Sequence, residues 1–161
     1  MLLWFAGLAA PAVAAVFSSR GLDYRFVLAG AVAPSLALAV EALWIMDSLL
    51  LPIAVMTAVM LGGWGRRLVQ RRWLGVPIGL FCHLVLDGAW LHTETFWWPL
   101  GAGEVAGRGL RPIWLLILME LIGAAALWWS WRRFGLTDPA RRRDFLRAGR
   151  LAVAPRAPRD R

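Results

Sequence analysis

The sequence predicts an all-α protein, a polytopic bundle of about five transmembrane helices, on three observations. Hydrophobic residues make up 60% of the 161 residues and charged residues only 17%, a balance too apolar for an ordinary soluble domain. The apolar residues fall into helix-length stretches separated by short polar links. The arginines gather in these links and at the C-terminal end, as the positive-inside rule describes. We therefore expect a membrane domain over residues 1–131 and an arginine-rich tail over residues 132–161.

Three spans are expected in the first part of the chain. Residues 1–17 are apolar with no cation before them, which favours a retained first span over a secretory signal peptide. Residues 26–46 form a second span, and the polar pair that starts at Asp47 ends it. Residues 49–64 form a third span that is short, about 24 Å at 1.5 Å per residue. Because of this shortness, a four-span arrangement with residues 26–64 rearranged is the alternative.

The remaining spans and the orientation follow from charge. Residues 65–73 contain four arginines and no acid, which indicates a cytoplasmic loop. The absence of lysine beside abundant Arg, Ala, Gly and Trp suggests a bacterial source, so the expected location is the bacterial inner membrane. Residues 74–91 form the fourth span, and the near-neutral residues 92–112 fit the outer side. The fifth span covers residues 113–131, where small residues from Gly123 onward predict close helix packing. The N-terminus is then outside and the C-terminus in the cytoplasm.

The tail is predicted to hold one short amphipathic helix. Asp138 is expected to cap it, Pro139 to begin it and Gly149 to end it. Residues 151–161 offer nothing to bury, and we expect them to be disordered. The tail arginines suit contact with anionic lipid headgroups, and the same charge pattern argues against a nucleic-acid partner.

The fourth span carries two ionisable residues, His83 and Asp87. An ionisable residue in a membrane segment costs roughly 2.5 to 3.5 kcal/mol on insertion scales, so the pair needs an explanation. At a spacing of four residues the two side chains share one helix face. Together they can hold a divalent ion, zinc or manganese. Alternatively, only the imidazole binds the ion, and the carboxylate orients it through a hydrogen bond. The alternative is a hydrogen-bonded pair that holds helices together.

Two further acids, Glu41 and Glu120, lie in the second and fifth spans at a depth close to that of Asp87, roughly 7 to 10 Å below the outer surface. We expect one of them to be a further ligand or the general base, and pairing with each other or with an arginine is the alternative. The outer mouth of the site is predicted to be lined by Asp47, His92 and Glu94.

The fourth span resembles a segment of the membrane-bound, metal-dependent hydrolases of the LexA-regulated type. The matching residues are His83, Leu84 and Asp87, followed by Trp98, Pro99 and Leu100. Pro34 looks like the start of the earlier Pro-Asp element of that family, with Ser35 in the position of the acid. The resemblance implies an integral membrane hydrolase, phosphodiesterase-like or phospholipase-like, with a divalent metal.

The first functional hypothesis is therefore a membrane hydrolase that acts on a lipid or lipid-linked phosphate ester. In it His83 and Asp87 are metal ligands, and Glu41 or Glu120 is a further ligand or the base. The second hypothesis is a non-catalytic accessory or scaffold subunit with a structural His-Asp pair, which contacts a protein partner through its spans and tail. A third is a small proton-coupled transporter that uses the same carboxylates.

Overall fold

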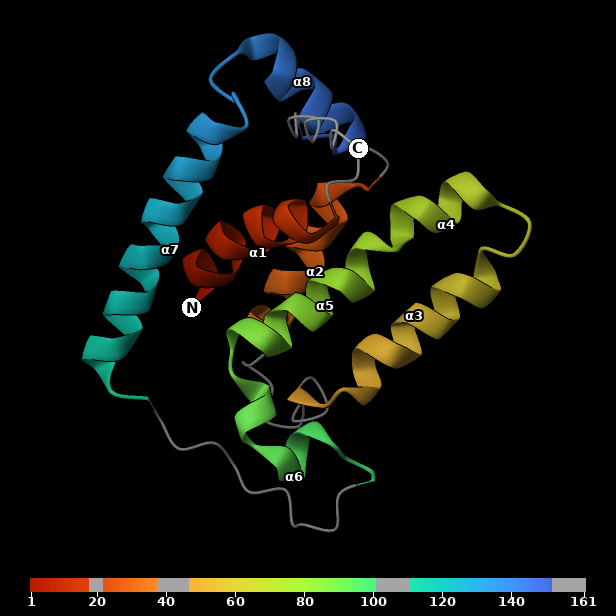
Figure 1. Cartoon of the computed structure of the whole chain (residues 1–161), viewed down its shortest axis with the longest axis vertical. Helices are drawn as coiled ribbons and strands as arrows, with labels where there is room; N and C mark the ends of the chain where they lie inside the picture. The colour runs from red at the N-terminus through yellow and green to blue at the C-terminus, as the bar shows by residue number, and fades with distance from the viewer. Residues whose placement is uncertain (18–21, 38–46, 101–110, 152–161) are drawn as a thin grey trace, which may run out of the picture.

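The computed structural model describes residues 1–17, 22–37, 47–100 and 111–151, and within these ranges it contains helices and no strands (Figure 1). This confirms the all-α prediction. The elements are α1 (Leu2–Phe17), α2 (Tyr24–Ala37), α3 (Leu50–Gly62), α4 (Arg67–Trp73), α5 (Gly75–Leu86), the 3-10 helix η2 (Ala89–Leu91), α6 (Thr93–Phe96), α7 (Ile113–Arg133) and α8 (Pro139–Ala148).

Helix α5 lies at the centre of this arrangement. It packs most extensively against α2, and it also contacts α1 and α3. Helix α1 lies between α2 and the long helix α7, which forms one edge of the molecule, while α3 and α4 form the opposite edge (Figure 1). One end of α5 lies beside α4 and the segment before α2, and the other leads into η2, which packs against α6.

Glycines allow α2 and α5 to approach closely. A Cβ atom added at Gly79 would lie 2.1 Å from the carbonyl oxygen of Val27, and one at Gly30 would lie 2.3 Å from that of Val76. Both distances are far below van der Waals contact, so only glycine fits without a shift of the backbone. Since Gly79 precedes His83 by one helical turn, this contact also fixes how near His83 lies to α2.

Glycines also allow α1 and α7 to approach closely. A Cβ atom at Gly7 would lie 2.1 Å from the carbonyl oxygen of Gly123, and one at Gly123 would lie 2.3 Å from the backbone of Leu3. The close packing predicted from the small residues that begin at Gly123 is thus confirmed.

Helix α7 is, among the described residues, the one helix long and apolar enough to cross a membrane by length and composition. It has 21 residues, and most of its surface is exposed in the isolated chain. The other apolar helices are shorter, with 16 residues in α1, 14 in α2 and 13 in α3.

Two predicted boundaries are wrong. The span expected over residues 74–91 stops as an α-helix at Leu86, because Gly88 adopts the left-handed conformation (φ 68°) that ends helices. The arginine-rich segment expected as a loop contains α4, whose Arg, Leu and Gln residues are good helix formers.

The tail helix begins and ends as predicted. The Asp138 carboxylate accepts a hydrogen bond from the Ala140 amide (2.9 Å), and Gly149 ends the helix at φ 64°. The expectation that residues 151–161 bury nothing is wrong for Leu151, which joins the core around Tyr24. Residues 152–161, predicted to be disordered, lie outside the described part of the chain.

A buried carboxylate, Asp23, joins three segments at this end of the molecule. It receives hydrogen bonds from Arg25 (2.8 and 3.0 Å) and Arg72 (3.1 Å), while the Tyr24 amide donates to the Gly149 carbonyl (2.9 Å). Burial raises the pKa of Asp23, but the hydrogen bonds and charges of the two arginines outweigh burial and hold the pKa below its ordinary value. The start of α2, α4 and the tail are thereby held together.

The first prediction concerns the glycine contact. Gly79→Ala should lower the thermal unfolding midpoint in detergent, at a cost of about 1–3 kcal/mol, because the new methyl group meets backbone atoms of α2. Gly62→Ala, where an added Cβ meets nothing within 4 Å, should leave the midpoint unchanged or slightly raised. Equal midpoints for the two variants would contradict this packing.

The second prediction concerns pH. Since the folded pKa of Asp23 is lowered, its carboxylate stabilises the fold above its ordinary pKa of 3.8, and this contribution disappears as pH falls through the lower folded value. Asp23→Asn should lower stability at pH 7 by about 1–3 kcal/mol and flatten the loss of stability below pH 4. Asp138→Asn should leave the midpoint at pH 7 unchanged, because asparagine is an equally good N-cap. A wild-type pH profile in Asp23→Asn would refute the role of this carboxylate.

Candidate metal centre

The C-terminal end of α5 brings negative charge into a buried place. Asp87 directly follows the helix as its C-cap, and the residue is only 7% exposed. The last carbonyl groups of a helix carry about half a negative charge, so a carboxylate is unfavourable there unless a cation is near. One of these carbonyls, that of Leu86, accepts a hydrogen bond from the indole of Trp4 (3.1 Å). Asp87 still needs a cation nearby.

His83 lies in the last turn of α5 and is held from two sides. Its Nδ1 atom is 2.8 Å from the carbonyl oxygen of Ala31 on α2, and its ring stacks on Phe5 of α1 with 4.0 Å between the centroids. Because a carbonyl oxygen only accepts, Nδ1 must carry the proton. Nε2 is then the nitrogen that can coordinate a metal, in the ring orientation that such a backbone contact commonly fixes in metal sites.

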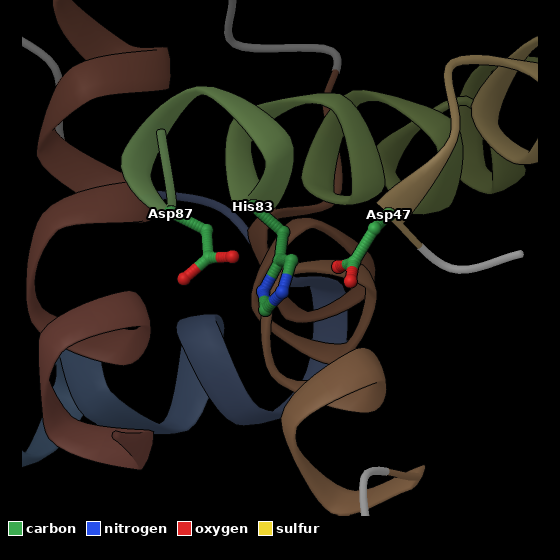
Figure 2. Close-up of side chains that lie close together, drawn as sticks. All are labelled: Asp47, His83 and Asp87. Carbon is green, nitrogen blue, oxygen red and sulfur yellow. The ribbon is translucent and has the colours of Figure 1, made fainter. Parts of the chain in front are cut away.

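Asp47 reaches the same place from the segment before α3. The Ser48 hydroxyl donates to the Trp98 carbonyl (2.8 Å), and the Leu49 amide donates to the Phe96 carbonyl (3.0 Å). These bonds tie the start of α3 to the end of α6. Figure 2 shows the result: the imidazole of His83 lies between the carboxylates of Asp47 and Asp87.

The donor set and its spacing suit a divalent metal. One ligand atom each from Asp47, His83 and Asp87 lies within 4.8 Å of the others. Two ligands on one zinc ion lie at most about 4.4 Å apart, twice the bond length, so small side-chain rotations would complete the geometry. One imidazole nitrogen with two carboxylate oxygens suits zinc or manganese, and three protein ligands leave a position open, as catalytic sites require.

The predicted ligands His83 and Asp87 thus lie together, and Asp47 joins them instead of only lining the mouth. Sequence reasoning gave Asp47 that outer position because it follows the end of an expected span. Its contact with His83 depends on the bonds of Ser48 and Leu49 to the segment around α6, which no local pattern records.

The other predicted site residues lie away from this group or outside the residues that the structure describes. The Glu120 carboxylate is 3.1 Å from the amino group of Met1 and accepts a bond from the Leu3 amide (2.9 Å), so it joins α7 to α1 and does not belong to the metal group. Glu41 lies outside the described residues. His92 is exposed, and the side chain of Glu94 is not among those described.

Arg111 is a residue of the site that sequence reasoning missed. Its guanidinium lies 3.1 Å from Oδ1 of Asp87 and donates to the Asp87 carbonyl oxygen (2.7 Å). It supplies positive charge at the negative end of α5. The sequence does place Arg111 next to Pro112, at the start of an apolar helix. Its charge was counted only in the balance of the loop and was not considered as a partner for Asp87.

Comparison with protein-family models, curated proteins and solved structures finds no match for this chain.

Proposed function

We propose that this chain is an integral membrane protein that binds a divalent metal through Asp47, His83 and Asp87 and hydrolyses a lipid or lipid-linked phosphate ester. The observation that carries the proposal is the meeting of an imidazole and two carboxylates, two of the three residues buried, within 4.8 Å. A bound zinc or manganese ion would lower the pKa of its water toward 7 and polarise a phosphoryl oxygen.

The chain's own residues prepare the site for such an ion. The Ala31 carbonyl and the Phe5 ring hold the imidazole in one orientation, so little side-chain freedom is lost on coordination. The end of α5 adds partial negative charge to that of Asp47 and Asp87. The two carboxylates and the end of α5 thus bring negative charge close to the imidazole of His83.

An apolar cavity in the same helical assembly supports a lipid as the substrate. It has a volume of about 570 Å³ and lies between α1, α3 and α5, within the range of roughly 300–1,000 Å³ usual for ligand sites. Its lining includes Val13, Leu49, Phe81 and Cys82. Cys82 directly precedes His83, and Leu49 lies two residues after Asp47, so two of the lining residues are neighbours in sequence of the polar group.

The membrane topology that we propose has about five spans, with the N-terminus outside and the arginine-rich tail in the cytoplasm. Helix α7 supports it by length, and its surface carries exposed apolar side chains such as Trp114, Ile117 and Leu121. The arginines of α4 and α8 fit one cytoplasmic side.

A second candidate function is a non-catalytic accessory subunit, in which this group is structural. The observation that favours it is the set of bonds from Arg111 to Asp87 and from His83 to Ala31. These contacts satisfy buried polar groups with protein partners, as helix-holding networks do. Metal binding separates the two candidates.

The third prediction is stoichiometric metal. Full-length protein purified in an uncharged detergent should bind one zinc or manganese ion, measured by mass spectrometry and calorimetry. Asp47→Asn, His83→Ala and Asp87→Asn should each weaken binding by more than about 100-fold, because changes outside the ligand shell alone cost about 10–100-fold. In nitrogen NMR spectra, zinc should shift Nε2 of His83 while Nδ1 keeps its proton.

His92→Ala and Glu120→Gln are the matched controls and should retain the metal, since neither residue lies in the group. Metal-loaded protein should then release headgroups from vesicles that contain lipid phosphodiesters, and Asp47→Asn should not. Metal without turnover on any phosphate ester would refute the hydrolase. Absence of metal after reconstitution would favour the accessory subunit.

The fourth prediction tests the topology. In a Cys82→Ser background, a cysteine introduced by Arg67→Cys should react with a membrane-impermeant maleimide only in inverted vesicles, and one introduced by Leu100→Cys only in intact cells without their outer membrane. Both positions are exposed in the isolated chain. Labelling of both from the same side would rule out the five-span arrangement.

A further inference from the structure

Arg111 is a cation in direct contact with the metal group, and its donors are only partly used. A guanidinium carries five N–H donors in a planar fork. In Arg111, one terminal nitrogen contacts the carboxylate and the carbonyl of Asp87. The other faces the sulfur atoms of Met1 (3.5 Å) and Met119 (3.9 Å), which are weak acceptors. The side chain is 27% exposed, so a ligand can reach it.

The charges of this group favour an anion once a metal is bound. Two carboxylates, Asp47 and Asp87, and one guanidinium give a formal charge of −1 with neutral His83. A divalent ion changes this sum to +1 and brings two cations to the same carboxylate, where they repel each other. A singly charged oxyanion restores neutrality, whereas a dianion leaves a net negative charge.

We propose that Arg111 binds a singly charged oxyanion, a phosphodiester, at the metal group; this inference rests on the proposed function and names the residue that recognises the ligand. The planar fork of arginine matches two phosphate oxygens better than any other side chain does. The contact with Asp87 holds the fork beside the site before the anion arrives.

The position of Arg111 allows two sources for this chemistry. It directly precedes Pro112, the N-cap of α7, and would lie at the boundary of the membrane if α7 crosses it. A lipid headgroup and a soluble phosphodiester both meet the charge requirement there.

The test measures zinc affinity by calorimetry for the full chain in an uncharged detergent, with and without dimethyl phosphate. Because coupling between sites is reciprocal, an anion that Arg111 and the metal share should tighten zinc binding, by about 10-fold. Arg133→Gln, at the far end of α7, should retain this effect. Arg111→Gln should still bind zinc, at least as tightly as wild type without phosphate, but lose the effect of dimethyl phosphate. Arg111→Lys should keep a reduced effect, since lysine retains the charge without the fork.

Several results would overturn the inference. Full coupling in Arg111→Gln would show that the anion binds elsewhere, and full coupling in Arg111→Lys would show that the planar fork does not recognise it. Loss of zinc in Arg111→Gln with complete recovery in Arg111→Lys would show that Arg111 only holds Asp87. Zinc binding in the wild type with no phosphate effect would overturn this inference alone, whereas no zinc in the wild type would refute the proposed function as well.

A second zinc titration distinguishes the two sources of the anion. It uses micelles that contain phosphatidylglycerol, a singly charged phosphodiester lipid. Coupling about tenfold stronger than with dimethyl phosphate at equal concentration would identify a lipid headgroup. Equal coupling would identify a soluble phosphodiester. Both results support anion binding by Arg111, provided that Arg111→Gln abolishes them.

Discussion

The close contact between α2 and α5 is the constraint on which the rest of this structure depends. Gly30 and Gly79 leave no room for a side chain between the two backbones, and this brings the Ala31 carbonyl within 2.8 Å of Nδ1 of His83. A buried imidazole without such a partner would destabilise the fold. The same bond places the proton on Nδ1 and leaves Nε2 as the nitrogen that can coordinate a metal. Helix packing and the chemistry of the site therefore have one physical origin.

The electrostatics at the end of α5 follow from where that helix stops. Gly88 ends it in the left-handed conformation, which leaves Asp87 at the negative end of the helix and buried. This arrangement is unfavourable alone and favourable beside positive charge. Arg111 supplies part of that charge, and the proposed metal would supply more. Asp87 needs a cation under both proposed functions. In the hydrolase a metal ion joins Arg111 beside this carboxylate, and in the accessory subunit Arg111 alone is its cation.

Sequence reasoning found part of the candidate site. The spacing of His83 and Asp87 placed two side chains on one helix face, because local geometry determines that relation. It gave Glu120 a role in the site from an estimate of depth, but depth does not determine the face of a helix, and its carboxylate bonds to the start of α1. Asp47 and Arg111 come from segments joined to the site only by long-range contacts, and such contacts leave no periodic signal.

What the sequence alone determined is the local structure: helices throughout the described ranges, the small residues at which α1 and α7 meet, and the tail helix from Asp138 to Gly149 with its caps. These features depend on periodicity, propensity and capping chemistry, which act over a few residues. The tertiary structure decided which helix faces meet, where α5 ends relative to its ionisable residues, and that Leu151 is buried against the segment around Tyr24. It also brought Asp47, His83 and Asp87 within 4.8 Å of one another. Such outcomes depend on packing between segments far apart in the chain, and only the folded backbone brings those segments together.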